Sequence, residues 1–181
     1  MPAMPEDHLK LRDGTAVLVR PLTPDDAVLY PEFLADVTVD DLRLRFFSSL
    51  RELSPALIDS LVHYDPATAM AFIAIEEKSG HMLGVVRLHD DNTREGGAEF
   101  AILVRSHLKG RGLGWLLMRH IIAYAKQKGL KVVHGQVLGE NTTMLQMCGE
   151  LGFHATDDPN ERGVKVVTLP MAEVPFLLTS P

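Results

Sequence analysis

The segment with the clearest chemical meaning is a glycine-rich loop that carries two cations, Lys109-Gly110-Arg111-Gly112-Leu113-Gly114. It follows a predicted strand and opens a predicted helix. Glycine lets the backbone approach a ligand closely, and the first N–H groups of a helix have no partner inside the helix. Together with the helix dipole, these groups form an anion site suited to phosphate. Since Lys109 and Arg111 add positive charge, the loop predicts a phosphorylated ligand.

Two common phosphate-binding loops do not fit this segment. A dinucleotide-binding loop needs a third glycine where Trp115 stands, and an acidic residue about 20 positions further on. Residues 100–139 contain no Asp or Glu. A Walker A loop needs Gly-Lys-Ser/Thr, which is missing here. The remaining alternative is a tight strand-to-helix turn, but three glycines and two cations are more than a turn requires.

The charge is distributed unevenly along the chain. The 181 residues include 18 Lys and Arg and 24 Asp and Glu, a net charge of −6 that argues against nucleic-acid or membrane partners. Residues 100–139 form a basic island, so the rest of the chain carries 11 cations against 24 acids. The island predicts a local anionic ligand, with a solvated cationic helix face as the alternative. Its seven cations are Arg105, Lys109, Arg111, Arg119, Lys126, Lys128 and Lys131.

Length and composition predict one globular domain over residues 1–181, with a core at about 10–170. Cys148 is the only cysteine, so no intrachain disulfide forms, and we expect a reducing, cytoplasmic location. The first residues do not resemble a signal peptide, and the apolar runs are too short to span a membrane. The eight histidines lack ligand spacing, so we expect no metal site.

Hydrophobic periodicity and turn residues predict a mixed α/β fold, a single sheet with helices on its faces. Helix starts at Thr23-Pro24, Asp40 and Ser54-Pro55 follow the first strand, and the first of these helices is expected to kink at Pro31. The predicted strands are 15–20, 70–76, 82–89, 98–104, 131–138 and 164–169, and the later helices are 112–127 and 141–151.

The loop at 109–114 resembles the Q/R-x-x-G-x-G/A pattern of the GNAT superfamily of acyl-CoA-dependent N-acyltransferases, with Lys109 in place of Gln or Arg. Asn141 and Leu151-Gly152-Phe153 match the tail motif of that family. The resemblance implies the GNAT fold, a mostly antiparallel central sheet whose fourth and fifth strands splay apart, flanked by helices. It also implies acetyl-CoA as cosubstrate, with its phosphates on residues 109–115: Lys109, Gly110, Arg111, Gly112, Leu113, Gly114 and Trp115.

Further motifs are Leu11-Arg12-Asp13-Gly14, Arg20-Pro21, Arg45-Phe46-Phe47, Ala98-Glu99-Phe100-Ala101 and Met144-Leu145. They resemble the acetyltransferase domain of bacterial Pat-type protein lysine acetyltransferases, a family that acetylates AMP-forming acyl-CoA synthetases. The resemblance therefore implies a protein partner with an exposed lysine, such as an acyl-CoA synthetase.

Glu99 is the candidate general base. An amine must lose its proton before it attacks a thioester, and Glu99 stands alone in an apolar strand, where partial desolvation would suit that role. The family resemblance implies a glutamate base at this point of the fourth strand. The alternative is an outward-facing glutamate on a half-exposed strand, and strand alternation cannot settle which face it takes.

The resemblance assigns the other site residues by position. It implies the Leu103 backbone N–H as the donor to the developing oxyanion, and N–H groups near Val104 and Arg105 as partners of the pantetheine arm. Asn141 would bind pantetheine, cap a helix, or both. Cys148 stands where many members have a proton-donating Tyr, but the simpler interpretation is a small buried hydrophobe.

The sequence therefore predicts an acetyl-CoA-dependent N-acetyltransferase that acts by direct transfer to an amine, with a protein lysine as acceptor. One alternative is a small-molecule amine N-acetyltransferase. Another is a non-catalytic acyl-CoA-binding module that regulates a partner.

Overall fold

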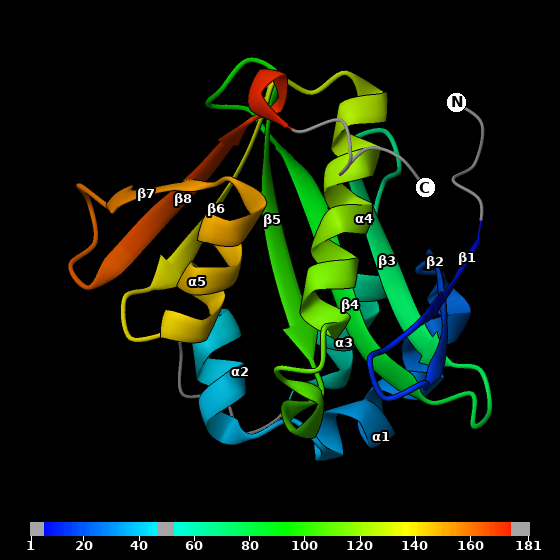
Figure 1. The fold of residues 1–181 in the computed structure, drawn as a ribbon. Coiled ribbons are helices and arrows are strands. Elements are labelled where there is room, and N and C mark those ends of the chain that lie inside the picture. Colours follow the sequence, from blue (N-terminus) through cyan, green and yellow to red (C-terminus); the bar gives the residue numbers. More distant parts are fainter. Residues whose placement is uncertain (1–5, 47–52, 175–181) are drawn as a thin grey trace. The chain divides into compact units, whose positions relative to one another are not determined.

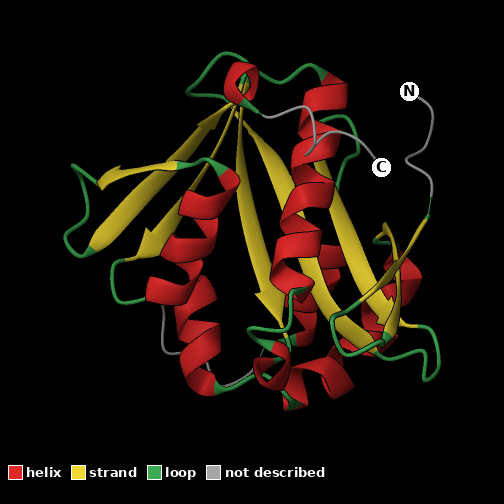
Figure 2. Cartoon of the chain, viewed as in Figure 1, coloured by secondary structure: helices red, strands yellow, loops and turns green. Residues whose placement is uncertain are grey.

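A computed structural model describes residues 6–46 and 53–174 of the chain. It contains two compact units. Unit 1 comprises Met1–Arg87 and Ile102–Met118, and unit 2 comprises Leu88–Ala101 and Arg119–Pro181. Two strands and one helix begin in one unit and end in the other. Figure 2 shows the strands in yellow and the helices in red.

The strands hydrogen-bond in the order β1-β2-β3-β4-β5-β6-β8-β7. The β1–β2, β2–β3, β6–β8 and β7–β8 pairs are antiparallel, whereas β5 and β6 are parallel. The predicted mixed sheet with helices is confirmed. Its strands are β1 (Asp7–Lys10), β2 (Ala16–Pro21), β3 (Ala69–Glu76), β4 (Met82–Asp91), β5 (Gly97–Val104), β6 (Val132–Leu138), β7 (His154–Asp157) and β8 (Val164–Pro170).

Along the chain, the shorter α-helices precede β3 and the longer ones follow β5 (Figure 1). The α-helices are α1 (Tyr30–Ala35), α2 (Val39–Phe46), α3 (Pro55–Val62), α4 (Leu113–Lys128) and α5 (Thr142–Leu151). The 3₁₀ helices are η1 (Pro24–Leu29), η2 (Ser106–Leu108) and η3 (Met171–Glu173).

The core of unit 1 packs the short helices against the strands. Tyr30 and Phe33 of α1 are 1% and 0% exposed, and their rings meet edge to face with centroids 6.2 Å apart. Leu42 of α2 and Val62 of α3 belong to the same cluster, together with residues of β3, β4 and β5. Burial of this apolar surface, rather than helix propensity, stabilises helices as short as six to eight residues.

The core of unit 2 contains an aromatic contact that depends on a glycine. The rings of Phe100 on β5 and Phe153 lie edge to face, with centroids 5.4 Å apart. A Cβ on Gly135 of β6 would come within 2.6 Å of the Phe100 ring, so only glycine fits there. In the same unit, α5 contacts β7, and its C-cap Gly152 lies near Leu169 of β8 (Figure 1). The helix buries Cys148 and Leu151.

Strands β5 and β6 separate soon after they begin to pair. Their ladder has three rungs, Gly97↔Val132, Ala98↔Val133 and Glu99↔His134. Strand β6 then continues for its full length of seven residues paired with β8. The predicted splay of the fourth and fifth strands, which are β5 and β6 in the full count, is therefore present. Glu99 occupies the last paired rung.

Three local features differ from the predictions. Strands β1 and β7 were not predicted, because each has only four residues. The helix predicted to kink at Pro31 is instead the 3₁₀ helix η1 followed by α1, with Pro31 in the first turn of α1, where a missing N–H costs nothing. The helix that was predicted over Asp40–Phe47 is α2, described over Val39–Phe46, and Phe47 lies outside the described residues.

Asp26 provides a test of the packing in unit 1. Its carboxylate accepts two bonds from the Arg20 guanidinium, at 2.8 and 2.7 Å, and one from the Thr23 N–H at 2.8 Å. Burial works to raise the pKa of Asp26, but the bonds from Arg20 and Thr23 outweigh it and hold the pKa below its ordinary value. The pair therefore stabilises the fold above the unfolded-state pKa of Asp, and this contribution is lost as the pH falls through the lower folded-state pKa.

We expect Asp26→Ala to lower the free energy of unfolding by about 3 kcal/mol at pH 7, because it leaves Arg20 without its partner. Urea denaturation at pH 7 and at pH 3 measures this loss, which should be smaller at pH 3. Asp25→Ala is the matched control, since Asp25 is the exposed neighbour. Equal losses for the two variants would contradict the assignment.

Candidate functional site

The segment that leads into the glycine loop is anchored to the helices of unit 1. The Ser106 hydroxyl accepts a bond from the Thr38 N–H at 2.9 Å and donates one to Asp41. The Ser106 N–H donates to the carbonyl of Asp36 at 3.1 Å. These bonds fix η2 against the start of α2, so the loop that follows has a rigid base.

Lys109 is bound to Asp41 of α2. Its Nζ lies 2.7 Å from Oδ1 of Asp41, a carboxylate only 12% exposed. Burial works to raise the pKa of Asp41, but the bonds from Lys109 and Ser106 lower it, and the lower value results. The carboxylate is therefore ionised at neutral pH and neutralises Lys109. Lys109 was predicted to provide positive charge for a phosphate, whereas in the structure its ammonium group pairs with Asp41.

The glycines of the loop adopt conformations that other residues avoid. Gly110 and Gly112 have φ values of +83° and +93°. Nothing lies within 4 Å of a Cβ built on Gly110, so the loop is open on that side. The Leu116 N–H donates to the Gly112 carbonyl at 3.1 Å and closes the first turn of α4. The N–H groups of Leu113, Gly114 and Trp115 precede that bond and have no acceptor within the helix, which is the arrangement predicted for an anion site.

Arg12 is a cation near this loop that the sequence analysis did not assign to the site. Its Nε lies 3.8 Å from the position that a Cβ on Gly112 would take. The next residue, Asp13, pairs with Arg111, with 3.2 Å between Oδ2 and Nη1. The turn between β1 and β2 therefore lies against the loop. Arg12 was noticed only within a family motif, because contact between residues 100 positions apart leaves no trace in local spacing.

The backbone of β5 has one edge bonded to β4 within unit 1. The Arg105 N–H donates to the Leu83 carbonyl at 3.0 Å, and N–H groups point to alternate edges along a strand. The Arg105 N–H therefore already has an acceptor within the fold. The roles predicted for the N–H groups of Leu103 and Val104 stay predictions.

The Arg105 side chain is also structural. Its Nε donates to the Met82 carbonyl at 2.8 Å, and its guanidinium pairs with Glu32 and Asp36 at the end of α1. The side chain is 6% exposed. These contacts join β4, η2 and α1, so Arg105 acts as a brace for unit 1 rather than as a ligand for the cosubstrate.

Glu99 lies on the exposed face of β5 in unit 2. Its neighbours Ala98 and Phe100 are buried, at 0% and 5% exposed, whereas Glu99 is exposed to solvent. The expected partial burial of this carboxylate is therefore wrong. The reason is strand alternation: the apolar residues around Glu99 occupy the opposite face and leave its own face open.

Asn141 precedes α5 and Cys148 lies within it, and the two residues have different surroundings. Asn141 is the N-cap, and its Oδ1 accepts the Met144 N–H at 3.3 Å, so the helix-cap interpretation is confirmed. Cys148 is 1% exposed, and burial raises the pKa of its thiol to about 12. A thiol with that pKa is a poor proton donor, which favours the small buried hydrophobe.

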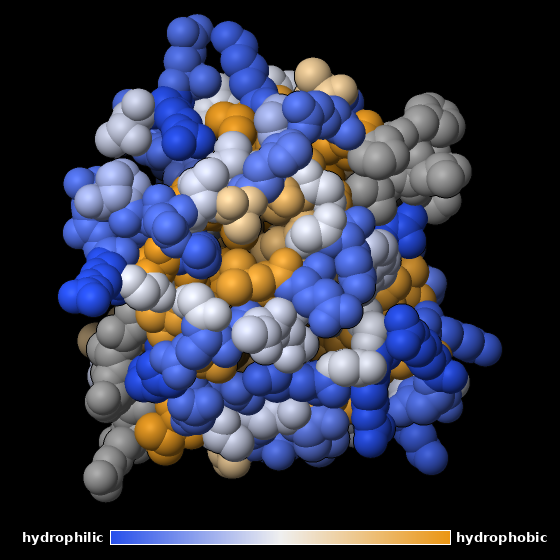
Figure 3. Space-filling model, turned by 60° about the vertical axis from the view of Figure 1, so that its left-hand side comes forward, coloured by the Kyte–Doolittle hydropathy of each residue, from blue (hydrophilic) through white to orange (hydrophobic). Residues whose placement is uncertain are grey.

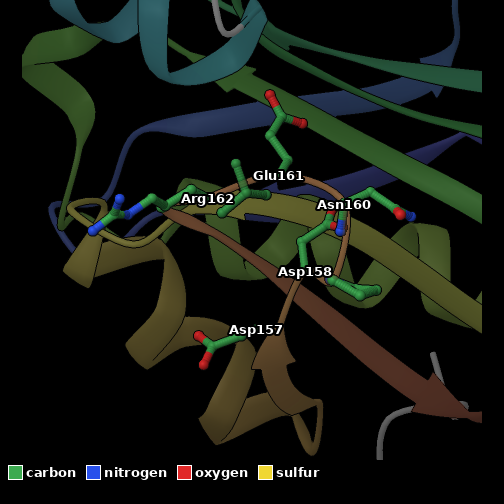
Figure 4. A pocket seen from close by; sticks show the side chains of 8 residues that line it. Asp157, Asp158, Asn160, Glu161 and Arg162 are labelled. Atoms are coloured by element: carbon green, nitrogen blue, oxygen red, sulfur yellow. The ribbon is translucent and has the colours of Figure 1, made fainter.

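A hollow of about 500 Å³ in unit 2 lies at the turn between β7 and β8. Its acidic side chains point in different directions and do not converge (Figure 4). Asp157 pairs with Lys165, and Asp158 accepts a bond from Gln136 at 2.8 Å. These contacts hold the turn that forms the hollow, and none of the predicted site residues lines it. It is lined by Asp157, Asp158, Pro159, Asn160, Glu161, Arg162, Gly163 and Val164.

Hydrophilic residues cover much of the face shown in Figure 3, with apolar residues exposed between them. Within residues 6–46 and 53–174, the helices are all too short or too polar to cross a membrane. Groups of three or more metal-ligating side chains are likewise absent from these ranges.

Comparison with known proteins identifies the family. The model of the acetyltransferase (GNAT) domain matches residues 16–154. The chain belongs to the GNAT acetyltransferases. It is 32% identical over 163 residues to acetyltransferase PA5475 of Pseudomonas aeruginosa, covering 88% of this chain and 87% of that one. This GNAT chain is also similar to the GNAT domain of S. lividans PAT, with a TM-score of 0.84 and 27% identity, covering 91% of this chain and 96% of that one.

A further relative is longer than the chain. The acetyltransferase Pat of Mycolicibacterium smegmatis is 26% identical over 169 residues, which cover 93% of this chain but 50% of Pat. The chain thus spans about half the length of that relative. As a GNAT acetyltransferase, it transfers an acyl group to an amine with acetyl-CoA as cosubstrate.

Cys148 offers a direct test of the burial described for α5. With its pKa raised to about 12, the thiol should react with a disulfide reagent at pH 8 about a thousandfold more slowly in the native protein than in guanidinium chloride. Absorbance of the released thiolate measures both rates, and Cys148 is the only thiol. Rapid reaction of the native protein would show that Cys148 is accessible.

Proposed function

We propose that this GNAT acetyltransferase transfers the acetyl group of acetyl-CoA to the side-chain amine of a protein lysine, with Glu99 as general base. Two similar proteins support the choice of acceptor, because one is named acetyltransferase Pat and the other is the GNAT domain of a PAT. An acyl-CoA synthetase is the acceptor to test first, and a cytoplasmic location fits such a partner.

The cosubstrate would bind through backbone groups more than through side chains. In this proposal, the diphosphate of CoA lies on the N–H groups of Leu113, Gly114 and Trp115, where α4 begins, while the Arg111 N–H donates to the Leu108 carbonyl at 3.2 Å. The pantetheine arm lies along the edge of β5 at Val104, as an added strand would. Arg12 supplies a nearby cation, since its Nε lies 3.8 Å from the position of a Cβ on Gly112. Asn141 would contact the arm while it caps α5.

The chemistry requires a deprotonated amine. At pH 8 about 0.4% of a lysine side chain is neutral, since its pKa is near 10.4. Glu99 takes the proton from the amine, directly or through a water molecule. The nitrogen lone pair forms the C–N bond at the thioester carbonyl, the C–S bond breaks, and CoA leaves as a thiolate that takes a proton from water. Exposure of Glu99 allows a large acceptor such as a protein lysine to reach it.

The observation that carries this proposal is the separation of β5 from β6 directly after Glu99. Within unit 2, the ladder between β5 and β6 ends at the rung of the proposed base, and Phe100 and Ala101 follow it along β5. The test is to incubate the enzyme with acetyl-CoA and purified acyl-CoA synthetases, and to map modified lysines by mass spectrometry. Acetylation of free amines alone would favour a small-molecule enzyme, and binding without any product would favour a regulatory module.

Glu99→Gln removes the proposed base and keeps the shape of the side chain. We expect kcat to fall about a hundredfold, while the Kd for acetyl-CoA measured by calorimetry stays unchanged, because the base contacts the amine and not the cosubstrate. Glu95→Gln is the matched control, since Glu95 is 93% exposed and lies in the turn before β5. Full activity of Glu99→Gln would exclude Glu99 as the base.

Gly110 and Gly163 have the same backbone geometry, so substituting each one distinguishes a loss of cosubstrate binding from the cost of backbone strain. Gly110 and Gly163 have φ values of +83° and +82°, and both have open space where a Cβ would stand. Alanine should therefore cost each fold about 1 kcal/mol. We expect only Gly110→Ala to weaken acetyl-CoA binding, by about tenfold, because the methyl group would stand in the path of the diphosphate. Equal affinity in the two variants would argue against cosubstrate binding at this loop.

A further inference from the structure

His134 occupies a defined position beside Glu99. The two residues are register partners on the parallel strands β5 and β6, at the last rung of that ladder. Residues on the same rung project from the same face of a sheet, and neighbouring strands lie about 4.8 Å apart. The imidazole and the carboxylate therefore rise side by side from the face that Glu99 shares with solvent.

The imidazole is held by a second carboxylate. His134 Nε2 lies 2.8 Å from Oδ2 of Asp91, at the end of β4. The other oxygen of Asp91 accepts bonds from the Thr93 N–H at 2.9 Å and the Thr93 hydroxyl at 2.6 Å. The side chains of His134 and Asp91 are 11% and 18% exposed, less than those of the carboxylate pairs made by His8, His63, His81, His107 and His154.

The bonds of Asp91 assign the tautomer of His134. Thr93 and, to a smaller extent, His134 hold the pKa of Asp91 below its ordinary value, so Asp91 is an ionised acceptor. The Nε2 of His134 must then donate, which leaves Nδ1 of the neutral ring as a proton acceptor. In acyl-transfer enzymes, a histidine that accepts protons is oriented by a carboxylate bonded to its other ring nitrogen, and Asp91 bonds Nε2 of His134 in the same way.

Few other titratable groups share this face of unit 2. On β4, His89 lies two residues before Asp91 and so projects to the same side. On β8, the register partner of His134 is Thr168, which does not titrate. Beyond it, His154 of β7 pairs with Thr168 and binds Glu173. The carboxylate of Glu99 is therefore the acidic group on the rung of His134.

We propose that His134, oriented by Asp91, is a positioning residue that relays the proton from Glu99 to solvent, which rests on the proposed role of Glu99 as base. The amine proton first forms the carboxylic acid of Glu99. It then passes to Nδ1 of His134, directly or through one water molecule, and Glu99 returns to the carboxylate. Asp91 stabilises the resulting imidazolium, which loses the Nδ1 proton to water and restores the neutral ring.

The test compares His134→Gln with wild type between pH 6 and pH 9, with acetyl-CoA and a lysine substrate. We expect kcat at pH 7 to fall about tenfold, with the KM for acetyl-CoA unchanged, and added imidazole to restore most of the loss. Asp91→Asn should produce a loss in the same direction, because it removes the charge that orients the ring. Rescue by a diffusible proton acceptor is not expected of a residue that only stabilises the fold.

His154→Gln is the matched control, because it removes another His–carboxylate pair from the same unit, at a rung two strands further from Glu99. It should keep wild-type kcat. Unchanged kcat in His134→Gln, or a loss that imidazole does not restore, would overturn the relay. Glu99→Gln is measured in parallel to separate the role of Glu99 from the role of His134. Full activity of Glu99→Gln would exclude Glu99 as the base. An inactive Glu99→Gln together with an unaffected His134→Gln would exclude only the relay.

Discussion

The structure depends most on how β6 distributes its backbone hydrogen bonds between its two neighbours, β5 and β8. It pairs with β8 over seven residues and with β5 over three. Backbone groups need partners, so a strand edge that its neighbour leaves unpaired is a place where a ligand can act as the next strand. In this chain the rungs between β5 and β6 within unit 2 end at Glu99. The proposed base Glu99 and the proposed binding residue Val104 both belong to β5.

Polar contacts in unit 1 keep the other half of the machinery rigid. The Arg105 guanidinium joins β4 to α1, and Ser106 and Lys109 join the loop to Asp41 of α2. These contacts link residues of the basic island to acids of the first 41 positions. The asymmetry of charge along the sequence is thus used largely within the fold, to hold the glycine loop in place.

Much of the fold could be predicted from local patterns. The meander of β3, β4 and β5 and the long helix α4 have strong periodicity, and the glycine loop has a chemical meaning that does not depend on tertiary structure. The elements that were missed, β1 and β7, are short strands at the ends of the strand order. The residues of β7 are all exposed, so they carry no apolar alternation to detect.

The site was harder to predict because its details depend on contacts distant in sequence. Lys109 and Asp41 are 68 positions apart, and local spacing does not indicate that the lysine pairs with this carboxylate. The face taken by Glu99 follows from which neighbours the core buries, which strand alternation leaves undecided. His134 was considered only as a metal ligand, and its place beside Glu99 emerges from the parallel register of β5 and β6.

The neutralised cations of the loop have a consequence for how binding responds to electrolyte. Lys109 and Arg111 each have a carboxylate partner, so in the proposed site the attraction for a diphosphate would come mainly from fixed peptide dipoles acting at contact distance. Dissolved ions screen distant exposed charges far more than short contacts with oriented N–H groups. Binding of the cosubstrate at this loop, if it occurs as proposed, would therefore persist in concentrated salt.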